Sequence, residues 1–502
     1  MSLPPMLPST LGVALLLVAA HLALRFAPVW PHRRQGCDAY YYLLCAEAFR
    51  ARRRLPIVLP PLYLLEPQEQ AYPPLMSMVL GMLPAPWVAR FYWAISPLID
   101  ALTLALLALW VGARFGPGYA LVAGLAYTAN ASLILEFSSL TSRPLALVET
   151  NGFLLASFAW IGGTAALLPL AIALGVMVLY THKLSVQLLW FLMPFLALAE
   201  GDRRWLVPLA GSYLVGFAVA PHLFVQILDG HRDIVTYWVR NWPLLNAHIV
   251  RRSPLYAGAN AGSAYYHPHD LRWLGRQLGK VLDYNCFIVF APAVALAWSD
   301  FGAAERFAAF WIAGTYIWGC ATYFVRPLRC LGEGNKYFKY ALLPSLFLAV
   351  AVAAETPSLA SACAAIFCAI WTGLSYWQTA RRMRGSATVM GRLTPELESL
   401  LARISANEEA RLMCLPAHLC DLVAYHTRRP VLWGTHGLGF TEAEPFFPVL
   451  RKPIEHFVRA YRLTHLLLDR RYVGLDELRL AHAGVMAQSG DYFLVAFAAP
   501  PA

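Results

Sequence analysis

Residues 11–30, LGVALLLVAAHLALRFAPVW, form an apolar run of about 20 residues, which is the length that a helix needs to cross the hydrocarbon core of a bilayer. No lysine or arginine precedes this run. A secretory signal normally has a charged stretch in front of a shorter apolar core. We therefore interpret residues 11–30 as a retained first membrane span.

Further apolar runs of about 17–25 residues follow the first one along the chain. They lie near residues 87–112, 116–136, 144–162, 164–180, 184–200, 205–228, 286–300, 304–325, 340–355 and 357–378. Together with the first run they predict about eleven transmembrane helices.

The composition excludes several classes of protein. The chain has 502 residues, of which 59% are hydrophobic and 14% charged, whereas a typical globular chain has about 25% charged residues. So few charges exclude a disordered chain and fit a soluble enzyme poorly. The net charge of +11 indicates anionic lipid or a phosphate-bearing substrate in a membrane protein, and no nucleic acid. The nine cysteines are too scattered for a disulfide scaffold, and none form a CxxC pair.

From residue 381 onward the spacing of apolar residues changes from long runs to shorter strand and helix patterns. Short strands are predicted at 410–416, 430–436, 464–472 and 491–497, and helices at 417–427 and 453–463 alternate with them. Thr394 and Pro395 suit the N-cap and first position of another helix. Such alternation predicts a partly parallel sheet. The tail has no GxGxxG or Walker loop, so we do not expect it to bind a nucleotide. We interpret it as a capping or partner-binding module.

These patterns predict a polytopic α-helical membrane protein with a small C-terminal extramembrane α/β domain. The predicted membrane module covers residues 1–380 and carries long extramembrane loops at 31–86 and 229–285. The predicted soluble domain covers residues 381–502.

The first long loop holds a candidate catalytic residue. Residues 36–50 read GCDAYYYLLCAEAFR, followed by ARRRLP at 51–56 and EQAYPPL at 69–75. Asp38 lies just before an apolar, aromatic helix, where an aspartate can act as an N-cap. The alternative is a general base at the membrane surface that deprotonates an acceptor hydroxyl.

An aspartate soon after the first span, an aromatic helix, a basic stretch and a YPPL element resemble the glycosyltransferase C superfamily. This superfamily includes the catalytic subunits of oligosaccharyltransferases, the protein O-mannosyltransferases and the aminoarabinose transferases of lipid A. The resemblance covers the layout of the whole chain. It implies an inverting glycosyltransferase that moves a sugar from a polyprenyl-phosphate donor to a hydroxyl of a glycan, lipid or protein acceptor on the non-cytoplasmic side.

The resemblance also implies roles for two carboxylates. Asp38 matches the position of the family's catalytic aspartate. The nearest candidate for the family's second acidic residue is Glu136, which leaves the acidic pair incomplete. The sequence therefore identifies no cofactor, and a divalent metal lacks the support of a clear acidic pair.

A departing lipid phosphate needs cations to stabilise its charge. The candidates are His182 and Lys183 in THK at 181–183, Arg143 before the fourth span, and the loop RPLRCLGEGNKYFKY at 326–340. In that loop Arg326, Arg329, Lys336 and Lys339 surround Glu333. Interfacial snorkelling and positive-inside anchoring are the alternatives for these cations. An ion pair with a neighbour is the alternative for Glu333.

Two carboxylates fall inside predicted spans, and such groups are costly in a bilayer. Asp100 lies in the second span and Glu149 in the fourth. Either a function or the packing of helices explains them equally well.

The orientation signals conflict. An odd number of spans places the tail and both long loops on one side. Short loops on that side hold more cations than those on the other side, which favours a cytoplasmic tail; the six are Arg143, Lys183, Arg326, Arg329, Lys336 and Lys339, against Arg114, Arg203, Arg204 and Arg306. Cations that bind a phosphate are placed by function, so we expect the tail on the periplasmic side of a bacterial inner membrane.

Two other functions compete with a transferase. A secondary transporter or lipid flippase would have paired repeats and broken helices around ionisable groups at the membrane midplane, but no internal repeat is visible. The other alternative is a non-catalytic assembly subunit whose tail recruits partners.

Overall fold

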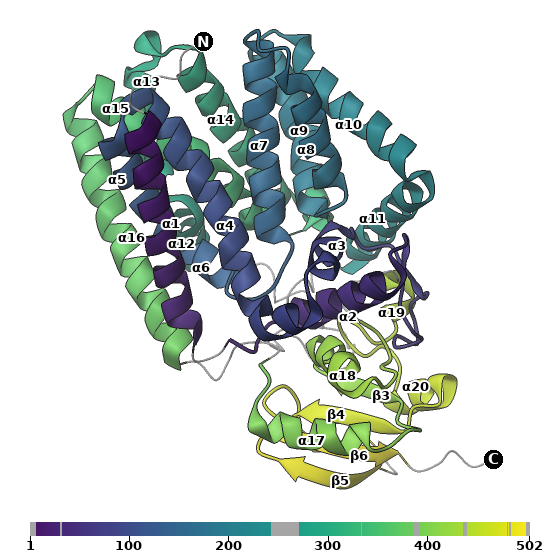
Figure 1. Cartoon of the computed structure of the whole chain (residues 1–502). Helices are drawn as coiled ribbons and strands as arrows, with labels where there is room; N and C mark the ends of the chain where they lie inside the picture. The colour runs from purple at the N-terminus through teal and green to yellow at the C-terminus, as the bar shows by residue number, and fades with distance from the viewer. Residues whose placement is uncertain are drawn as a thin grey trace. The chain divides into compact units, whose positions relative to one another are not determined.

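The structure is a computed structural model that describes residues 7–30, 33–241, 271–332, 334–385, 392–434, 439–478, 480 and 483–497 (Figure 1). Its residues divide into two compact units that interleave along the chain. The first, here called the membrane unit, comprises Met1–Arg33, Phe91–Pro221 and Leu271–Ala387. The second, here called the loop-and-tail unit, comprises Arg34–Arg90, His222–Asp270 and Thr388–Ala502.

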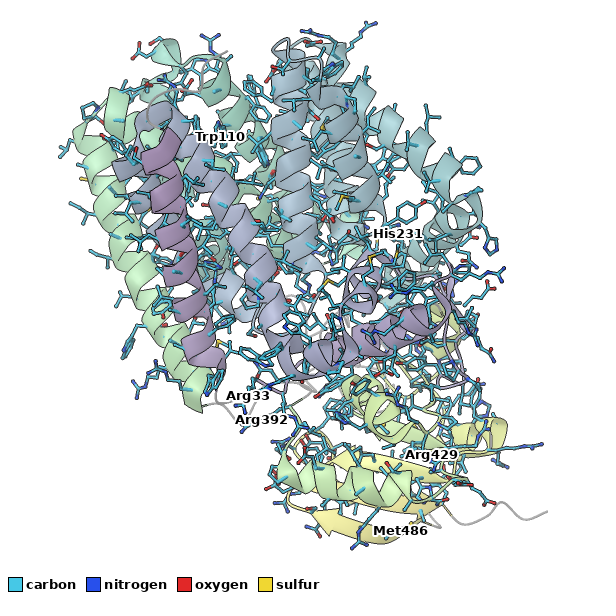
Figure 2. The ribbon with its side chains drawn as sticks, in the orientation of Figure 1. Arg33, Trp110, His231, Arg392, Arg429 and Met486 are labelled. Carbon is cyan, nitrogen blue, oxygen red and sulfur yellow. The ribbon has the colours of Figure 1, made fainter. Side chains whose placement is uncertain are left out.

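The membrane unit is built of helices. They are α1 (Leu7–Val29), α4 (Ala85–Phe115), α5 (Pro117–Thr128), α6 (Ala131–Glu136), α7 (Arg143–Ile161), α8 (Leu167–Leu179), α9 (Lys183–Ala199), α10 (Leu206–Val219), α12 (Leu271–Asn285), α13 (Ala291–Leu296), α14 (Ala303–Phe324), α15 (Leu342–Glu355) and α16 (Leu359–Gly385). Short 3-10 helices join them at η2 (Arg203–Trp205), η4 (Cys286–Phe290), η5 (Trp298–Asp300), η6 (Arg326–Leu331) and η7 (Gly334–Ala341). Aromatic stacking contributes to their packing, as between Trp110 of α4, labelled in Figure 2, and Phe347 of α15. Their ring centroids are 3.9 Å apart.

By length and composition, six helices of the described residues can cross a membrane, at Ser9–Val29, Ala85–Phe115, Arg143–Ile161, Gly275–Leu296, Gly334–Glu355 and Leu359–Arg384. A seventh would arise if α10 and the following helix α11 (Pro221–Asn241) formed one span. The predicted run at 205–228 breaks at Ala220 because proline disfavours a helical residue before it. The prediction of a polytopic helical membrane protein is confirmed, and the number of eleven spans stays a prediction.

A buried ion pair joins three helices of the membrane unit. The fully buried Asp100 on α4 lies 3.2 Å from Nε2 of His21 and 3.2 Å from Nη2 of Arg25, both on α1. The Tyr127 hydroxyl on α5 donates to Asp100 over 2.6 Å. These contacts indicate that Asp100, a carboxylate inside a membrane-crossing helix, serves to hold the helices together. Glu149 is also buried, on α7.

The loop-and-tail unit combines both long loops with the tail. Its elements are α2 (Cys37–Arg52), β1 (Ile57–Val58), β2 (Glu69–Gln70), α3 (Leu75–Met82), α11, α17 (Pro395–Ser405), β3 (Leu412–Leu415), η8 (Ala417–Leu419), α18 (Cys420–Thr427), α19 (Phe440–Ala443), α20 (Ile454–Tyr461), β4 (His465–Asp469), η9 (Asp476–Leu478), β5 (Ala483–Ser489) and β6 (Tyr492–Phe497).

The tail contains a four-stranded sheet with the order β3-β4-β6-β5. β3 pairs with β4 in parallel, and the other two pairs are antiparallel, which confirms the expected partly parallel sheet. Thr394 caps α17 by accepting the Leu397 amide, and Pro395 follows it, as predicted. The strand predicted at 430–436 is wrong: within its described residues only Val431 forms bridges, to Tyr63 and Leu412.

The first long loop is folded onto the tail. The Leu64 amide donates to Val431 O over 3.0 Å, and the Val431 amide donates to Leu62 O over 2.8 Å. The buried hydroxyl of Tyr63 donates to Asp421 on α18 over 2.8 Å, and Glu66 accepts the Gly434 amide over 2.7 Å. The loop therefore satisfies its backbone and side-chain polar groups through the tail. The predicted division into residues 1–380 and 381–502 stays a prediction.

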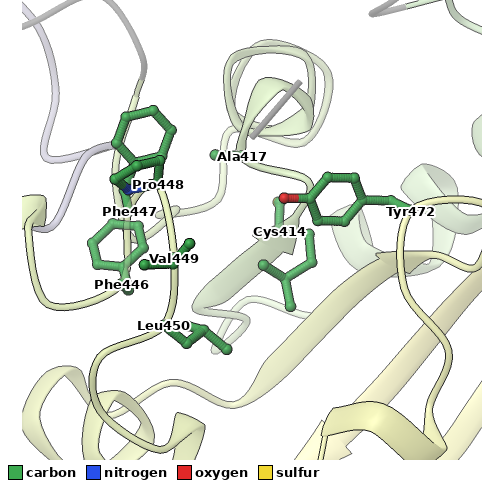
Figure 3. A pocket seen from close by; sticks show the side chains of 9 residues that line it. Cys414, Ala417, Phe446, Phe447, Pro448, Val449, Leu450 and Tyr472 are labelled. Atoms are coloured by element: carbon green, nitrogen blue, oxygen red, sulfur yellow. The ribbon is translucent and has the colours of Figure 1, made fainter. Parts of the chain in front are cut away.

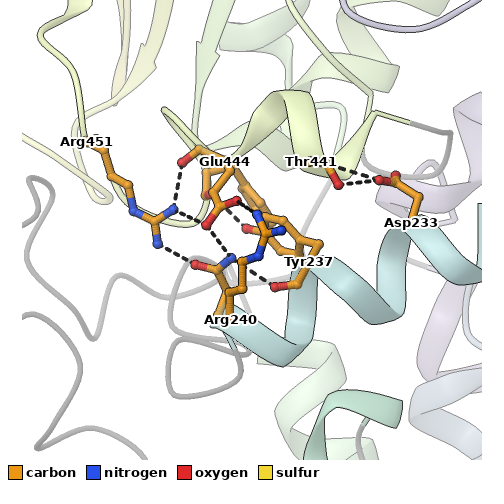
Figure 4. A network of polar contacts seen from close by, with 8 residues as sticks. Asp233, Tyr237, Arg240, Thr441, Glu444 and Arg451 are labelled. Carbon is orange, nitrogen blue, oxygen red and sulfur yellow. Dashed lines mark hydrogen bonds and ion pairs between the residues drawn. The ribbon is translucent and has the colours of Figure 1, made fainter.

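α11, from the second long loop, is held by the same unit (Figure 4). The Tyr237 hydroxyl donates to Phe447 O over 2.7 Å. Glu444 accepts from Arg240 at 3.3 Å and from Arg451 at 2.8 Å. Asp233 accepts the Phe440 amide over 3.0 Å. Residues 242–270 of this loop lie outside the described residues, and its last part, residues 271–285, forms α12 of the membrane unit.

The Tyr63–Asp421 contact can be tested by removing one oxygen. Tyr63→Phe leaves the buried Asp421 carboxylate without this donor, which costs about 1–3 kcal/mol. We expect faster hydrogen–deuterium exchange in residues 59–66 and 420–427. Tyr119→Phe on α5 is the control, since the Tyr119 side chain is exposed. Unchanged exchange in both segments of the Tyr63 variant would contradict the proposed coupling of loop and tail.

Candidate functional site

Asp38 lies in the first turn of α2 and not at its N-cap. Gly36 occupies the N-cap position with a φ of 108°, which favours glycine, and no side chain caps the helix there. The interpretation of Asp38 as an N-cap is therefore wrong. The half-buried Asp38 carboxylate still lies at the positive end of the helix dipole.

Contacts along α2 hold this helix rigidly within the loop-and-tail unit. Arg50 donates to the carbonyls of Leu80 at 3.0 Å and Leu83 at 3.1 Å, at the end of α3. The Tyr41 hydroxyl donates to Gln70 over 3.0 Å. The Tyr40 ring lies 5.1 Å from the ring of His426 on α18. Asp38 is therefore carried by a packed helix, as a catalytic side chain requires.

The membrane unit gathers charged and polar side chains from three distant parts of the chain, here called the cationic cluster. Its members are Glu136 at the end of α6, Arg143 at the start of α7, His182 and Lys183 at the start of α9, and Lys336 and Lys339 on η7. The buried Lys339 ammonium donates to Glu136, and the Tyr284 hydroxyl donates to the other Glu136 oxygen over 2.6 Å.

Hydrogen bonds and close packing place η7 beside α9 and α14. The Tyr340 hydroxyl lies 2.7 Å from Ser185 Oγ, and the Tyr337 hydroxyl donates to Gln187 over 2.6 Å. A Cβ atom at Gly334 would lie 2.6 Å from the carbonyl oxygen of Gly319 on α14, so only glycine fits there. The position of the η7 lysines relative to Lys183 is thereby fixed.

The charges of the cationic cluster do not cancel. Burial alone would raise the pKa of Glu136, but attraction by Lys339, Arg143 and Lys336 lowers this pKa to about 2. Glu136 is therefore ionised at neutral pH and balances one cation. Arg143, Lys183, Lys336 and Lys339 together carry more positive charge than the single Glu136 carboxylate balances, and such a net positive charge attracts a phosphate.

His182 adds a neutral polar group to this cationic cluster. Burial lowers the pKa of His182 well below its usual value, and repulsion by Arg143, Lys339, Lys183 and Lys336 lowers it further. Among the described residues, its buried Nδ1 atom has no hydrogen-bond partner. α7 and α9 also begin at Arg143 and Lys183, and the N-terminus of a helix favours an anion.

Arg329, another predicted phosphate ligand, is engaged by backbone carbonyl groups. Arg329 donates to the carbonyls of Tyr323 at 3.1 Å and Phe324 at 3.3 Å, so it closes the end of α14. The backbone of Arg326 begins η6, and Glu333 lies outside the described residues. Asp38 belongs to the loop-and-tail unit, and a shared cavity with the cationic cluster stays a prediction.

The sequence did not reveal the true partners of Glu136. The loop pattern places Lys339 near Glu333, whereas the structure pairs it with Glu136, and no sequence pattern indicates the contact with Tyr284. The available signal is physical: a carboxylate at the end of an apolar run needs a cation, because an unpaired charge is costly to bury. Which cation it takes depends on the fold, since Glu136 and Lys339 are 203 residues apart.

A divalent metal does not fit the residues around Glu136. Both Glu136 oxygens accept hydrogen bonds, from Lys339 and Tyr284. Across the part of the chain that the structure describes, no group of three His, Cys, Asp or Glu side chains could hold a metal ion.

The contribution of the Glu136–Lys339 ion pair to the stability of the protein can be tested. Glu136→Gln leaves a buried ammonium without its counter-charge, so we expect a loss of about 3–5 kcal/mol. Thermal unfolding of the detergent-solubilised protein measures it. The double variant Glu136→Gln/Lys339→Met removes both charges and should regain part of the loss. A single variant as stable as the parent protein would show that the two charges are not coupled.

Comparisons with known proteins find similarity only at the level of structure. No family model and no curated protein matches the chain. The oligosaccharyltransferase of Archaeoglobus fulgidus in complex with Zn and sulfate is 14% identical, with a TM-score of 0.58, over 91% of this chain and 68% of that one. The same archaeal enzyme, AglB, with an inhibitory peptide and a dolichol-phosphate is 11% identical, with a TM-score of 0.58, over 92% of this chain and 69% of that one.

ArnT from Cupriavidus metallidurans bound to undecaprenyl phosphate is 15% identical, with a TM-score of 0.55, over 97% of this chain and 98% of that one. Both kinds of protein were named by the resemblance of residues 36–75, which is thus confirmed for the fold. The chain therefore has the same fold as the archaeal oligosaccharyltransferase and ArnT.

Proposed function

We propose that this protein is an integral membrane glycosyltransferase that moves a sugar from a polyprenyl-phosphate donor to an acceptor hydroxyl, with inversion, on the periplasmic side of a bacterial inner membrane. The cationic cluster carries this proposal. Its four cations outnumber its one carboxylate, Glu136, and two of them, Arg143 and Lys183, lie at helix N-termini. Similar folds solved with dolichol-phosphate and undecaprenyl phosphate support a lipid-phosphate ligand.

The chemistry assigns each group one task. Asp38 accepts the proton of the acceptor hydroxyl, whose oxygen forms a bond to the anomeric carbon. The bond between that carbon and the phosphate oxygen breaks, and the polyprenyl phosphate leaves. Attack from the face opposite the leaving group inverts the anomeric centre. This sequence of events needs Asp38 and the cationic cluster to reach the same donor.

The cations act on the leaving group. Negative charge grows on the phosphate as the bond breaks, and fixed cations stabilise this charge most where water is excluded. Arg143, Lys183 and Lys336 supply these cations. Lys339 forms an ion pair with Glu136 and therefore has a supporting role in the site.

A carrier function is less well supported. Of the two intramembrane carboxylates that would serve a transporter, Asp100 and Glu149, Asp100 is engaged by Arg25, His21 and Tyr127 and holds helices together. A moving ion or substrate would have to break this buried ion pair, which is costly.

The catalytic role of Asp38 is tested by Asp38→Asn. Loss of a general base lowers turnover by about 10²–10⁴-fold, with the KM for the donor nearly unchanged. The assay uses purified protein, a radiolabelled undecaprenyl-phosphate sugar and a cell-envelope extract as acceptor. Glu47→Gln, on the same helix, is the control, since Glu47 forms a half-exposed ion pair with Arg428. Parental turnover in the Asp38 variant would remove Asp38 from the mechanism.

Donor binding is tested separately. Arg143→Gln, Lys183→Gln and Lys336→Gln each remove a charge, and a charge-assisted hydrogen bond contributes about 1.5–3 kcal/mol. We therefore expect Kd for undecaprenyl phosphate to rise about tenfold or more, as measured by native mass spectrometry in detergent. Arg204→Gln is the control, because Arg204 pairs with Asp202 at an exposed turn. Equal affinities in all four variants would place the phosphate elsewhere.

A further inference from the structure

The end of α2 carries three consecutive exposed arginines, Arg52, Arg53 and Arg54, here called the arginine corner. Across the residues that the structure describes, none of the three forms an ion pair. The carboxylate nearest to them along α2, Glu47, is already paired with Arg428 over 2.8 Å. The arginine corner therefore presents positive charge that no acidic side chain balances.

The backbone at the end of α2 fixes the central arginine. Arg53 ends the helix with a φ of 50°, in the left-handed region, and its amide donates to Phe49 O over 2.7 Å. The Arg53 guanidinium lies 5.8 Å from the centroid of the Phe49 ring. A cation–π contact orients a guanidinium without neutralising it, so the charge stays available to bind an anion.

Arg50, one turn earlier, fastens α2 to α3. Its guanidinium donates to Leu80 O over 3.0 Å and to Leu83 O over 3.1 Å. A Cβ atom at Gly81 would lie 2.7 Å from the Phe49 ring, so glycine allows the two helices to touch. The end of α2 and the end of α3 are therefore held side by side.

Exposed apolar side chains follow directly after these fastened ends. Met82, the last residue of α3, is 62% exposed, and Trp87, in the first turn of α4, is 38% exposed. Tryptophan is enriched where lipid headgroups meet the hydrocarbon core. The surface beside the arginine corner is therefore apolar as well as cationic.

The membrane-crossing helix α4 sets the depth of this surface. Between Arg90 and Arg114, the cations near its two ends, α4 rises about 36 Å at 1.5 Å per residue. This rise slightly exceeds the hydrocarbon thickness of about 30 Å. Arg90 thus lies at the level of the headgroups. The arginine corner is fastened to Leu83, just before α4 begins, and so lies at the membrane surface.

We propose that the arginine corner binds the phosphate headgroups of anionic membrane phospholipids, while Met82 and Trp87 contact their acyl chains. This inference goes beyond the proposed function, because it concerns lipids of the surrounding membrane and does not depend on sugar transfer. A guanidinium offers several N–H groups to the oxygens of one phosphate. The charge of the corner therefore selects an anionic headgroup, and the apolar side chains select a lipid over a free phosphate.

A pocket in the tail is a poorer match for such a lipid. It is lined by Cys414, Leu415, Ala417, Tyr472 and the segment Phe446–Leu450 (Figure 3). None of these lining side chains is a cation. A phosphate would lose its water there without gaining a counter-charge, which is costly.

Photo-cross-linking in vesicles tests the proposed lipid site. The full chain is reconstituted into phosphatidylcholine vesicles that contain a small fraction of phosphatidylglycerol with a photoreactive acyl chain. Parallel vesicles contain the same fraction of photoreactive phosphatidylcholine. Peptide mass spectrometry should find several times more adducts from phosphatidylglycerol on residues 75–90. Equal yields from the two lipids on these residues would overturn the proposal.

A triple variant tests the arginines themselves. Arg52→Gln/Arg53→Gln/Arg54→Gln removes the charges and keeps long polar side chains at exposed positions. One cation near an anionic surface contributes about five-fold in affinity. We therefore expect the preference of residues 75–90 for phosphatidylglycerol to disappear. An unchanged preference would overturn the proposal. If the variant does not fold, the comparison of the two lipids on the parent protein still decides.

The matched control removes three exposed arginines of the tail, in Arg403→Gln/Arg459→Gln/Arg462→Gln. It lowers the net charge of the protein by the same amount, and Arg462, like Arg53, ends a helix with a positive φ. Labelling of residues 75–90 in this variant should equal that of the parent protein. A loss of preference equal to that of the first triple variant would attribute the effect to net charge and overturn the site.

Inorganic phosphate distinguishes a lipid headgroup from a free anion. Added phosphate should lower the yield of adducts no more than chloride at the same ionic strength, because both only screen the charges. A selective loss of adducts in phosphate would show that the arginine corner binds a free phosphate, which would contradict a site for membrane lipid.

Discussion

The buried ion pair between Glu136 and Lys339 is the constraint on which the cationic cluster depends. An ammonium group inside a protein needs a counter-charge, and Glu136 provides one from a helix 203 residues away. This pair holds Lys339 in place within a cluster that has more cations than carboxylates, and in the proposed function Arg143, Lys183 and Lys336 act on the leaving phosphate.

This pair belongs to a chain of polar contacts through the membrane unit. The Tyr284 side chain binds Glu136, and its carbonyl accepts from Asn130 over 3.0 Å. The Asn130 side chain also caps α6, and its carbonyl accepts from Arg25 over 3.2 Å. Arg25 in turn pairs with Asp100. The intramembrane carboxylate Asp100 and the cationic cluster are thus parts of one supporting framework, in which each buried polar group is held by the next.

In the loop-and-tail unit, the tail supports the loop that carries Asp38. The tail supplies partners for the backbone of residues 62–65 and for the side chains of Tyr63 and Glu66. It also packs against the aromatic face of α2. A catalytic carboxylate on α2 would then be held by rigid secondary structure, although it lies in a segment that the sequence presents as a connecting loop.

Local signals predicted local structure well. Thr394 and Pro395 begin α17 as expected, and α7 and α9 start within one residue of the predicted runs. β5 was missed because Gly484 and a bulge between Val485 and Ala487 disturb the alternation of apolar residues. Residues 430–436 failed as a strand because Val431 bonds partly to the first loop, a partner that no local pattern indicates. For the same reason the sequence indicates each cation of the cluster separately but does not indicate that Lys339 is the partner of Glu136.

The most direct test of the account is a cryo-electron microscopy structure of the protein in lipid nanodiscs with undecaprenyl phosphate. The account predicts the phosphate density against Arg143, Lys183 and Lys336, with the Asp38 carboxylate on the side where the sugar would lie. Phosphate density at a site without these three cations, or an Asp38 carboxylate on the opposite face of the membrane, would contradict it.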